Sequence, residues 1–508
     1  MNPAISGAEV GVGTSGDGAL AVSVDLPDET ATAALAEDVA ASLGRGDLVT
    51  LSGPLGAGKT TFARALIRAI ADDPSLEVPS PTFTLVQSYT GGRLKLAHFD
   101  LYRVGEAAEL DELGFDEALG DGAVLMEWPE RARDRLPPAR LDLSLAPAGG
   151  GRRATLTAAG ALAERLARNR AIRGFLDRSG WQRAARRHLV GDGSNRRYER
   201  IHRDGTTAVL MDWPPGEPPM RDPRAAHRAR DVRAFVAVDA GLRALGLSAP
   251  AIYAGDPPAG LLLLEDFGRA GVLRPDGSPD PERYAAAVDV LVYLHSARRP
   301  SELPLPDGSM HALPPYGPEA FAVEVELFAD WYVPSASGKA LAAEARAEFV
   351  ELWRELTGEL ARVEENWVLL DYHSPNLLWL ADRAGLRRVG ILDFQDLLVG
   401  PSAYDVASLC QDARVTIPAD LEQALCTRYI AGRSAEGRFD RESFEIAYAI
   451  LTAQRTTKIM GVFTRLATEG KRFYLQHIPR LREYLQRSLA HPALNRYALW
   501  HEKHLPPP

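Results

Sequence analysis

The sequence predicts two domains in one chain: an α/β domain built around a phosphate loop, followed by an α+β domain with two lobes. The chain has 508 residues, which is too long for one ordinary domain. Near its beginning, the stretch GPLGAGKT follows an apolar run and precedes a helical pattern. In its last third, LLDYHSPNLLWL places an Asp, a His and an Asn among apolar residues. These observations point to two separate polar sites.

The composition is that of a globular protein, with 46% apolar and 25% charged residues. A net charge of −10 argues against a broad nucleic-acid-binding surface, although it allows a local basic patch. The two cysteines, Cys410 and Cys426, have no metal-like spacing, and we expect small buried side chains in a reducing compartment. The N-terminus lacks the pattern of a signal peptide, and the apolar runs are too short to span a membrane. We therefore expect a cytoplasmic protein without a membrane partner.

The first domain is expected at residues 21–165, after a flexible Gly/Ser-rich N-terminus at 1–20. The strand AVSVDL comes first, and a helix follows from Glu29 to Leu43 with Asp28 as its N-cap. The strand DLVTLSG enters the phosphate loop, and the amphipathic helix TTFARALIRAI leaves it. LKLAHFDLY and AVLMEWP indicate buried strands that end in acids, and RLDLSLAP with RRATLTA indicates a hairpin.

The second domain is expected at residues 166–508, because an Arg-rich helical run begins near Arg165. This run, Arg165 to Arg187, favours a solvated helix face over a contact with tRNA. A three-stranded meander, a helix from Ala225 to Leu245 and the apolar strand LLLLEDFG follow. The remainder is mostly helical, apart from a strand pair around LLDYHSPNLLWL and VGILDFQD. The predicted architecture is therefore a mixed domain rather than a duplicate of the first.

GPLGAGKT matches the phosphate-loop pattern G-x-x-x-x-G-K-[ST] in full. Its glycines let backbone N–H groups surround phosphates, and the following helix N-terminus adds positive potential. Lys59 is expected to reach the β- and γ-phosphates of ATP, and Thr60 to bind Mg²⁺. Asp100 and Glu127 end apolar strands, where acids orient the metal and the attacking water. The expected nucleotide contacts of this loop are Gly53, Gly56, Ala57, Gly58, Lys59, Thr60 and Thr61.

Further motifs narrow the class of this first domain. SPTFTLVQSY, HFDLYRV, ELGFDEAL and EWPERA follow GAGKTTF in that order. Over residues 20 to 158 the chain resembles the TsaE family, the ATPase of bacterial tRNA threonylcarbamoyladenosine synthesis. The resemblance implies ATP hydrolysis with protein partners of the TsaB and TsaD type, and tRNA as an indirect partner. It also implies that Thr60, Asp100 and Glu127 serve Mg²⁺ and hydrolysis, that Thr82 lies in a switch-like loop, and that Trp128 flanks the nucleotide. Pro54 departs from the Asp that the family often has.

The second candidate site consists of Asp371, Asn376 and Asp393. Asp371-x-x-x-x-Asn376 is a weak pattern alone, but Asp393 follows the apolar strand VGIL seventeen residues beyond Asn376. Kinase-like phosphotransferases place a catalytic Asp and a metal-binding Asn on one loop, and a second metal-binding Asp after the next strand. Asp371 is thus expected to accept the proton of a hydroxyl acceptor, while Asn376 and Asp393 hold Mg²⁺ against ATP.

This half resembles the aminoglycoside phosphotransferase-like superfamily over residues 168 to 505, and within it the anomeric sugar kinases of the AmgK type. GDGSNRRY, AVLMDWPP, LLLEDFG, DYHSPNLLWL, ILDFQD, GPSAYDVASL, QRTTKIMGVFTRL and LAHPAL carry the resemblance. It implies a bilobal protein-kinase-like fold and ATP-dependent phosphorylation of the anomeric hydroxyl of N-acetylmuramate and N-acetylglucosamine, in cell-wall recycling. The acceptor would be a small amino sugar, which Arg455 and Lys458 are placed to approach.

Two departures from the superfamily pattern leave alternatives open for the function of the second domain. Leu369 stands where the superfamily usually has a His two places before the catalytic Asp. No Lys occurs from Gly191 to Glu265, although a kinase normally offers a strand Lys to the phosphates. Ser194, Arg196 and Arg197 of the loop GDGSNRRY are the candidate replacements for this ATP contact. Two other interpretations remain: a kinase of another small acceptor, such as an aminoglycoside or choline, or an inactive kinase-like binding domain attached to the ATPase.

Overall fold

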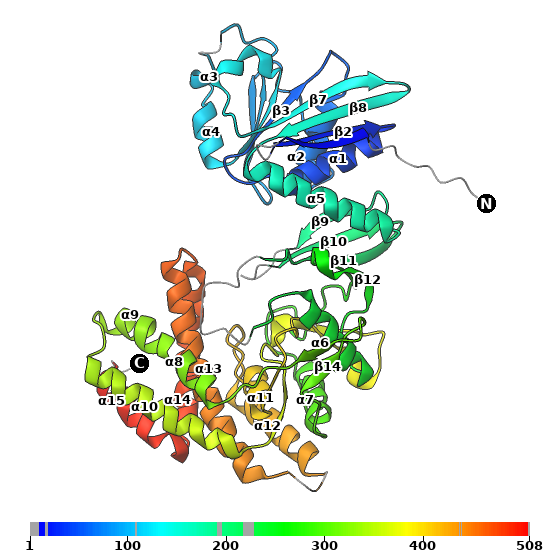
Figure 1. Cartoon of the computed structure of the whole chain (residues 1–508). Helices are drawn as coiled ribbons and strands as arrows, with labels where there is room; N and C mark the ends of the chain where they lie inside the picture. Colours follow the sequence, from blue (N-terminus) through cyan, green and yellow to red (C-terminus); the bar gives the residue numbers. More distant parts are fainter. Residues whose placement is uncertain are drawn as a thin grey trace, which may run out of the picture. The chain divides into compact units, whose positions relative to one another are not determined.

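The chain forms two compact units, Met1–Asp212 and Trp213–Pro508 (Figure 1). The structure is a computed structural model that describes residues 10–15, 19–106, 109–189, 196–216, 228–435, 437 and 439–505. The two units are described separately below.

The first unit contains a mixed sheet whose described strands run in the order β1-β2-β8-β7-β3-β6-β5-β4. The central strands β7, β3, β6 and β5 are parallel neighbours, whereas the outer pairs are antiparallel. The strands are β1 (Val10–Ser15), β2 (Ala19–Leu26), β3 (Leu48–Ser52), β4 (Val86–Tyr89), β5 (Leu96–Asp100), β6 (Ala123–Glu127), β7 (Leu141–Ala148) and β8 (Gly151–Ala158). The helices are α1 (Glu29–Ser42), α2 (Lys59–Ala71), α3 (Glu109–Glu112), α4 (Phe115–Asp121) and α5 (Ala161–Arg178).

The core of this unit lies on both faces of the sheet. One apolar cluster joins α1, α2 and α5 to strands such as β3 and β7, and includes Phe62, Leu66 and Leu143. The other cluster covers the opposite face and includes Phe99 and Met126. Asp28 caps α1 as predicted, because its Oδ1 accepts a hydrogen bond of 2.7 Å from the N–H of Ala31. Because the central strands are parallel, their carboxyl ends lie on the same side of the sheet. The phosphate loop follows β3 on that side.

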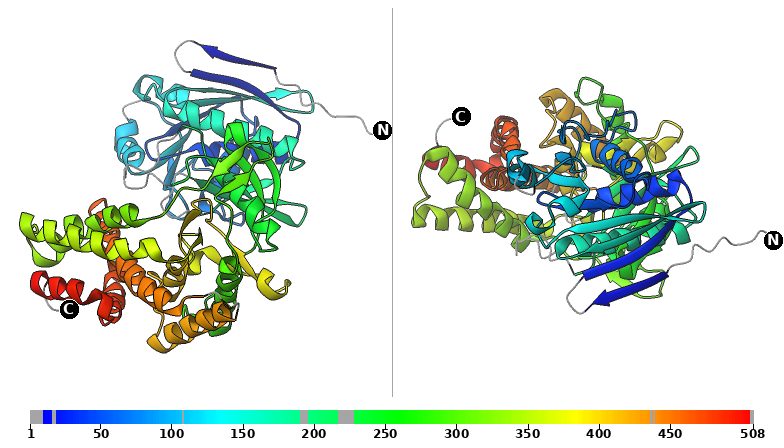
Figure 2. Two further views of the ribbon diagram at one scale, coloured as in Figure 1. Left: turned by 60° about the horizontal axis from the view of Figure 1, so that its bottom comes forward. Right: turned by 90° about the horizontal axis from the view of Figure 1, so that it is seen from above.

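The N-terminus is partly ordered, which differs from the flexible segment expected at 1–20. Val10–Ser15 forms β1 and pairs antiparallel with β2 at the edge of the sheet, as the views in Figure 2 show. The exposed backbone groups of β2 provide a template for this pairing.

The first unit also extends further than predicted. The boundary expected at Arg165 falls inside the continuous helix α5, and the compact units divide after Asp212. Beyond α5, an antiparallel meander follows, as predicted, with β9 (Ala185–Leu189), β10 (Arg197–Arg203) and β11 (Thr206–Asp212). The continuous helix α5, which packs its buried residues against the first unit, extends across the expected boundary.

The second unit is mainly helical, as predicted. Its described helices are α6 (Val232–Ala244), α7 (Pro281–His295), α8 (Pro318–Leu327), α9 (Val333–Ser337), α10 (Ala343–Glu359), α11 (Ala403–Cys410), α12 (Ala419–Ser434), α13 (Arg441–Thr468), α14 (Ile478–Leu489) and α15 (Asn495–His504). Short antiparallel strand pairs interrupt them: β12 (Ile252–Asp256) with β13 (Leu261–Glu265), β14 (Glu302–Pro304) with β15 (Met310–Ala312), β16 (Glu365–Val368) with β19 (Leu398–Pro401), and β17 (Leu377–Trp379) with β18 (Val389–Ile391). The helix predicted from Ala225 begins at Val232, where Asp231 caps it; residues 225–227 lie outside the described residues.

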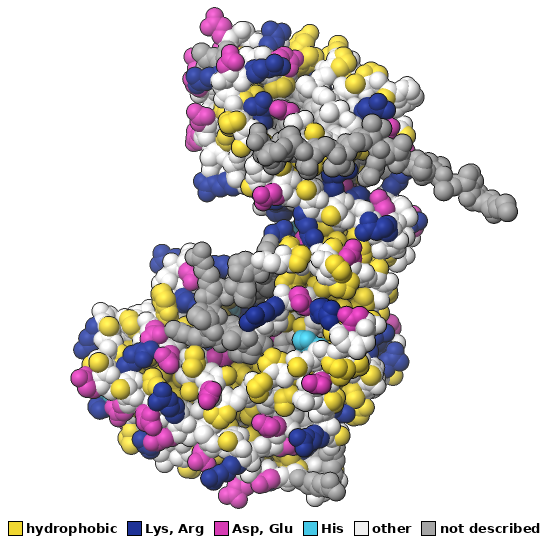
Figure 3. All heavy atoms as spheres, in the orientation of Figure 1, with side chains coloured by type: hydrophobic (Ala, Val, Ile, Leu, Met, Phe, Trp, Pro, Cys, Tyr) yellow, Lys and Arg dark blue, Asp and Glu magenta, His cyan; other side chains and the backbone are white. Residues whose placement is uncertain are grey.

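The surface agrees with the modest net charge. On the face drawn in Figure 3, basic and acidic side chains are interspersed among the coloured residues. Within the described parts of the chain, no helix combines the length and apolar character needed to cross a membrane. Cys410 is buried and Cys426 is half-buried, and both are free thiols.

Candidate active sites

The phosphate loop connects β3 to α2 and has the backbone that its glycines allow. Gly53, Gly56 and Gly58 have φ angles of 135°, 80° and 99°, a region that other residues rarely adopt. A Cβ on Gly53 would also lie 2.3 Å from the carbonyl oxygen of Leu145. Lys59 starts α2, and its Nζ donates to the carbonyl oxygens of Gly53 (2.8 Å) and Pro54 (3.2 Å). The sequence-predicted loop Gly53–Thr61 is thus a closed cradle at a helix N-terminus.

The predicted acids lie together at the ends of two neighbouring strands. Asp100 and Glu127 are register partners on the parallel strands β5 and β6, and both are buried. Thr82 Oγ1 donates to Asp100 Oδ2 at 2.8 Å, which ties the expected switch-like loop to this acid. Glu127 Oε1 lies 3.1 Å from Nε2 of His98. The arrangement holds the Asp100 carboxylate against the Thr82 hydroxyl and the Glu127 carboxylate against a buried imidazole.

Trp128 and the acids also surround Lys59. The Lys59 ammonium lies 3.8 Å from the centre of the Trp128 ring. Burial lowers the pKa of Lys59, and Glu127, Glu130 and Asp100 oppose this effect only in part. Phosphate oxygens placed in the loop would therefore add a further anionic partner for this lysine.

Arg152 is a site residue that the sequence reasoning missed. An added Cβ on Gly58 would lie 2.6 Å from Arg152 Nε, so the guanidinium of this β8 residue packs against the loop. An arginine beside a transferred phosphoryl group can stabilise its charge. The pair Arg152-Arg153 in RRATLTA was visible in the sequence, but only the β7–β8 hairpin shows which arginine reaches the loop.

The second site is built on the predicted strand pair. Leu377 pairs with Ile391 in the β17–β18 ladder, and the N–H of Leu392 donates to the carbonyl oxygen of Asn376 at 2.9 Å. Asn376 therefore lies opposite the residue that precedes Asp393. The Asn376 side-chain N–H donates to the backbone oxygen of Asp371 at 2.9 Å, which leaves its amide oxygen for a cation.

The loop before Asp371 is held by a buried carboxylate. Leu370 adopts a positive φ of 67°, and the N–H groups of Leu369 and Leu370 donate to Asp405 at 2.7 and 3.0 Å. Burial raises the pKa of Asp405 to about 7, against the lowering effect of these two hydrogen bonds. Asp405 comes from the motif GPSAYDVASL, to which the sequence alone assigned no role. Leu369 occupies the position at which the superfamily usually has a His, and its backbone N–H is one of the two donors to Asp405.

Arg228 is the second missed residue. Its Nη1 lies 3.4 Å from Asp371 Oδ2 and 3.0 Å from Asp396 Oδ2. Burial alone would raise the pKa of Asp371, but Arg228, with further cations beside it, lowers that pKa below its ordinary value. No motif identifies Arg228, which follows a Pro- and Arg-rich stretch of the sequence.

The predicted acceptor-side residues also approach Asp371. Lys458 and Arg455 contribute to lowering its pKa, after Arg228 and His373, the latter of which was not among the predicted acceptor-side residues. Lys458 donates to Glu324 at 2.7 Å, and Arg455 donates to the carbonyl oxygen of Gln411 at 3.1 Å. Asp371 is therefore bordered by several positively charged groups.

The expected residues of the second site are distributed over the two units. Asp371, Asn376 and Asp393 belong to the second unit. Arg197, which is exposed, starts β10 in the first unit, and the half-buried Arg196 directly precedes this strand. Ser194 lies outside the described residues.

The residues of both sites suit Mg²⁺ bound together with phosphates. Among the described residues, no group of three or more His, Cys, Asp or Glu side chains is placed to hold a metal ion by itself. Thr60, Asp100 and Glu127 at the first site, and Asn376 with Asp393 at the second, provide hard oxygen donors. Mg²⁺ usually takes one or two such groups together with phosphates and water.

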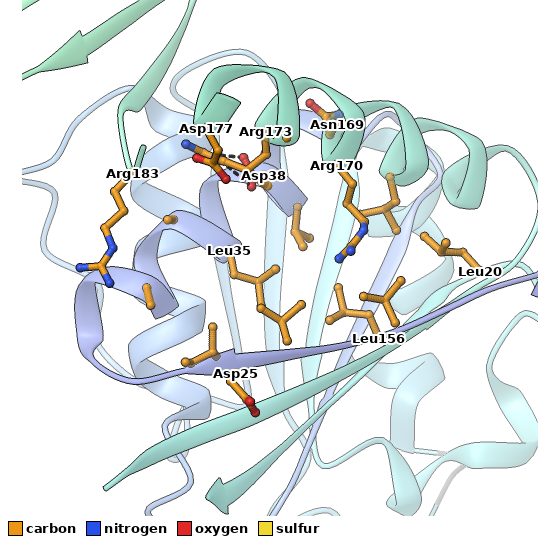
Figure 4. A pocket seen from close by; sticks show the side chains of 18 residues that line it. Leu20, Asp25, Leu35, Asp38, Leu156, Asn169, Arg170, Arg173, Asp177 and Arg183 are labelled. Atoms are coloured by element: carbon orange, nitrogen blue, oxygen red, sulfur yellow. Dashed lines mark hydrogen bonds and ion pairs between the residues drawn. The ribbon is translucent and has the colours of Figure 1, made fainter. Parts of the chain in front are cut away.

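A separate pocket of about 270 Å³ lies in the first unit between α1, α5 and strands β2 and β8 (Figure 4). Apolar side chains such as Leu35 and Leu156 form its floor, and charged residues of α1 and α5 line its rim. The phosphate loop contributes no residue to it.

Comparison with known proteins finds two families in this chain, and the second match begins within the first compact unit. The family model described as "Threonylcarbamoyl adenosine biosynthesis protein TsaE" matches residues 26–154, and that described as "Phosphotransferase enzyme family" matches residues 185–440. The N-acetylmuramate/N-acetylglucosamine kinase of Caulobacter vibrioides is 36% identical over 350 residues, covering 65% of this chain and 95% of the relative. The tRNA threonylcarbamoyladenosine biosynthesis protein TsaE of Bacillus subtilis is 40% identical over 136 residues, covering 26% of this chain and 82% of the relative. The solved structure of YdiB from Bacillus subtilis aligns with a TM-score of 0.25 and 34% identity, covering 30% of this chain and 96% of that one.

The folds and sites define a P-loop nucleotide-binding domain fused to a kinase-like phosphotransferase. The chain belongs to the phosphotransferase enzyme family, and its N-terminal part belongs to the TsaE family. It is an enzyme, and both resemblances expected from the motifs are confirmed.

Proposed function

We propose that this chain is a bifunctional enzyme. The first domain hydrolyses ATP for the threonylcarbamoylation of tRNA, and the second phosphorylates the anomeric hydroxyl of N-acetylmuramate and N-acetylglucosamine. The observation that carries the second activity is that Asn376 precedes β17 and Asp393 follows its partner strand β18, while Asn376 donates a hydrogen bond to the backbone of Asp371. The relatives' names supply the acceptor and the tRNA role.

For the first domain, the proposal rests on the closed loop and the adjacent acids. Lys59 and Thr60 would contact phosphates and Mg²⁺, while Asp100 and Glu127 would orient the metal and the attacking water. The family resemblance assigns this hydrolysis to a complex with TsaB- and TsaD-type proteins. We therefore expect slow turnover by the chain alone and faster turnover with those partners.

For the second domain, Asp371 would accept the proton of the attacked hydroxyl. Asn376 and Asp393 would hold Mg²⁺, which when bound neutralises charge on the ATP phosphates. The brace from Asp405 fixes the loop in position, so the base need not reorganise during the reaction. An anomeric hydroxyl is more acidic than other sugar hydroxyls, which suits a base whose pKa is held low.

The charges around Asp371 favour an acidic acceptor over a cationic one. Arg228, Lys458 and Arg455 border this aspartate, and N-acetylmuramate carries a carboxylate that such groups can pair with. Aminoglycosides and choline are cations and would meet like charge there. This argument ranks the amino-sugar acceptor above the aminoglycoside or choline alternative.

A phosphate-transfer screen tests the proposal. ADP release would be followed with N-acetylmuramate, N-acetylglucosamine, an aminoglycoside and choline, using wild-type protein and Asp371→Asn. We expect transfer to the amino sugars, and a loss of kcat of about 10²–10⁴ in Asp371→Asn, which keeps the shape but cannot take the proton. Absence of transfer to every acceptor would favour an inactive binding domain, and full activity in Asp371→Asn would refute the assigned base.

A further inference from the structure

The β9–β10 hairpin of the phosphotransferase segment is held in the first unit by a buried arginine. Arg186 of β9 is 6% exposed, although its side chain is charged. Its Nε and Nη2 donate to the two carboxylate oxygens of Glu199 on β10, at 2.5 and 2.8 Å. Its Nη1 donates to Asp38 of α1 at 2.9 Å, and Nη2 also donates to Asn169 of α5 at 2.7 Å.

Asp38 is the common acceptor of this network. Besides Arg186, it accepts two hydrogen bonds from Arg173 of α5, at 2.7 and 3.0 Å, and the pair is drawn in Figure 4. Arg173 in turn donates to the carbonyl oxygen of Ala184, directly before β9. One carboxylate of the TsaE-like domain therefore fixes both α5 and the start of the hairpin.

The helix α5 connects α1 to the end of β11 through two further hydrogen-bonded side chains. On one face, Asn169 donates to Ser42 of α1 at 2.9 Å. On the other, Arg168 donates to Asp212 at the end of β11 at 2.5 Å. The run Arg165 to Arg187 was expected to form a solvated helix face. Instead, Arg168, Arg173 and Arg186 of this run take part in an internal network of ion pairs. Only Ala159 and Gly160 separate β8 from α5, so no long linker divides the two family segments.

We propose that Asp38, a residue of the TsaE-like domain, is a positioning residue for the phosphotransferase half. By holding Arg186, it orders the β9–β10 hairpin, in which Arg197 starts β10 and Arg196 directly precedes it. This inference rests on the proposed contact of these two arginines with ATP. The first domain then acts as a scaffold for the second activity, independently of its own ATP hydrolysis.

We expect a small change at Asp38 to have a strong effect on the order of the β9–β10 hairpin. Breaking a buried charge pair leaves the partner charge without compensation, which is far more damaging than losing an exposed pair. Asp38→Asn removes the charge with little change in volume and deprives Arg186 and Arg173 of the carboxylate that they share. Asp38→Glu keeps the charge and should therefore keep much of the wild-type order of the hairpin.

The test combines hydrogen exchange with kinetics in the full-length chain. In Asp38→Asn, we expect backbone exchange in β9 and β10 to accelerate at least tenfold. We also expect the KM for ATP in sugar phosphorylation to rise severalfold with kcat nearly unchanged, while P-loop hydrolysis stays at the wild-type rate. Asp25→Asn is the matched control, because it removes an exposed carboxylate paired with Arg153 at 2.7 Å in the same domain.

The outcomes separate this inference from the proposed function. Wild-type exchange in β9 and β10 of Asp38→Asn, or equal acceleration throughout the first unit, would overturn the positioning role. Faster hairpin exchange with an unchanged KM for ATP would overturn it as well. If wild-type protein phosphorylates no acceptor, the proposed function fails, and nucleotide binding by Lys59→Ala with and without Asp38→Asn replaces the kinetic measurement. Arg186→Lys, which keeps the charge but not the paired hydrogen bonds, should give an intermediate effect if Asp38→Asn does not fold.

Discussion

Asp371 Oδ2 lies 3.4 Å from Nη1 of Arg228, so the candidate base is paired with a cation. Burial would raise the pKa of Asp371, and Arg228 is the leading group that lowers it instead. The base acts only when deprotonated, so this pairing keeps it competent at lower pH. The same contact also places a donor where an acidic acceptor would bind.

Replacement of Arg228 by Gln should therefore raise the pKa of Asp371. The acid limb of the pH profile of kcat/KM, which reports the free enzyme, should move to higher pH. Arg233→Gln is a control, because Arg233 pairs with Asp307 in an exposed contact of 3.0 Å. An acid limb that stays at the wild-type pH in Arg228→Gln would show that Arg228 does not tune the base.

The two sites should be catalytically independent. Lys59→Ala removes the cation that is expected to contact the β- and γ-phosphates in the first loop and should abolish hydrolysis there. Sugar phosphorylation should remain within about twofold of wild type, since the folded scaffold persists. Both activities would be assayed on the same preparation. Loss of sugar phosphorylation in a folded Lys59→Ala protein would contradict independence.

Arginine should replace the missing strand lysine at the second site. Alanine at both Arg196 and Arg197 removes guanidinium groups that can pair two phosphate oxygens at once. We expect the KM for ATP to rise by about tenfold, which corresponds to about 1.4 kcal/mol. Arg203→Ala, at the other end of β10, serves as the control. Unchanged KM and kcat in the double variant would exclude this role.

His295 should make the stability of the second unit depend on pH. The buried ring lies 2.9 Å from the Tyr429 hydroxyl and 3.2 Å from the carbonyl oxygen of Trp367, and burial lowers its pKa from 6.5 to about 3. Since the unfolded chain binds the proton more readily, stability is full above pH 6.5 and falls as the pH drops toward 3. The loss between pH 6.5 and pH 5 should be about 2 kcal/mol.

Urea unfolding at several pH values would measure this loss. The neutral variant His295→Gln should lack this share of the pH dependence, whereas a variant of the exposed His202 should keep it. Identical pH dependence in wild type and His295→Gln would show that another group is responsible.

The sequence predicts the local parts of both sites well. The phosphate loop, the acids that end β5 and β6, and the Asp371–Asn376–Asp393 series depend on short spacings and strand periodicity, which are visible in the chain. Arg228, Asp405 and Arg152 could not be found in this way, because their roles depend on contacts between distant segments. The same reason explains α5: its arginines match a solvated face by composition, and only their contacts with Asp38 and Asp212 reveal an internal network. Whether the described site residues bind ATP stays a prediction.

The central claim is that the second domain phosphorylates the anomeric hydroxyl of an amino sugar. The most direct measurement is ADP release with N-acetylglucosamine and N-acetylmuramate, compared with the methyl glycoside of each, in which that hydroxyl is blocked. We predict turnover of the free sugars, no turnover of the glycosides, and inhibition by the glycosides if they still bind. Turnover of the methyl glycosides at a rate comparable to the free sugars would place the phosphate on another hydroxyl and contradict the claim.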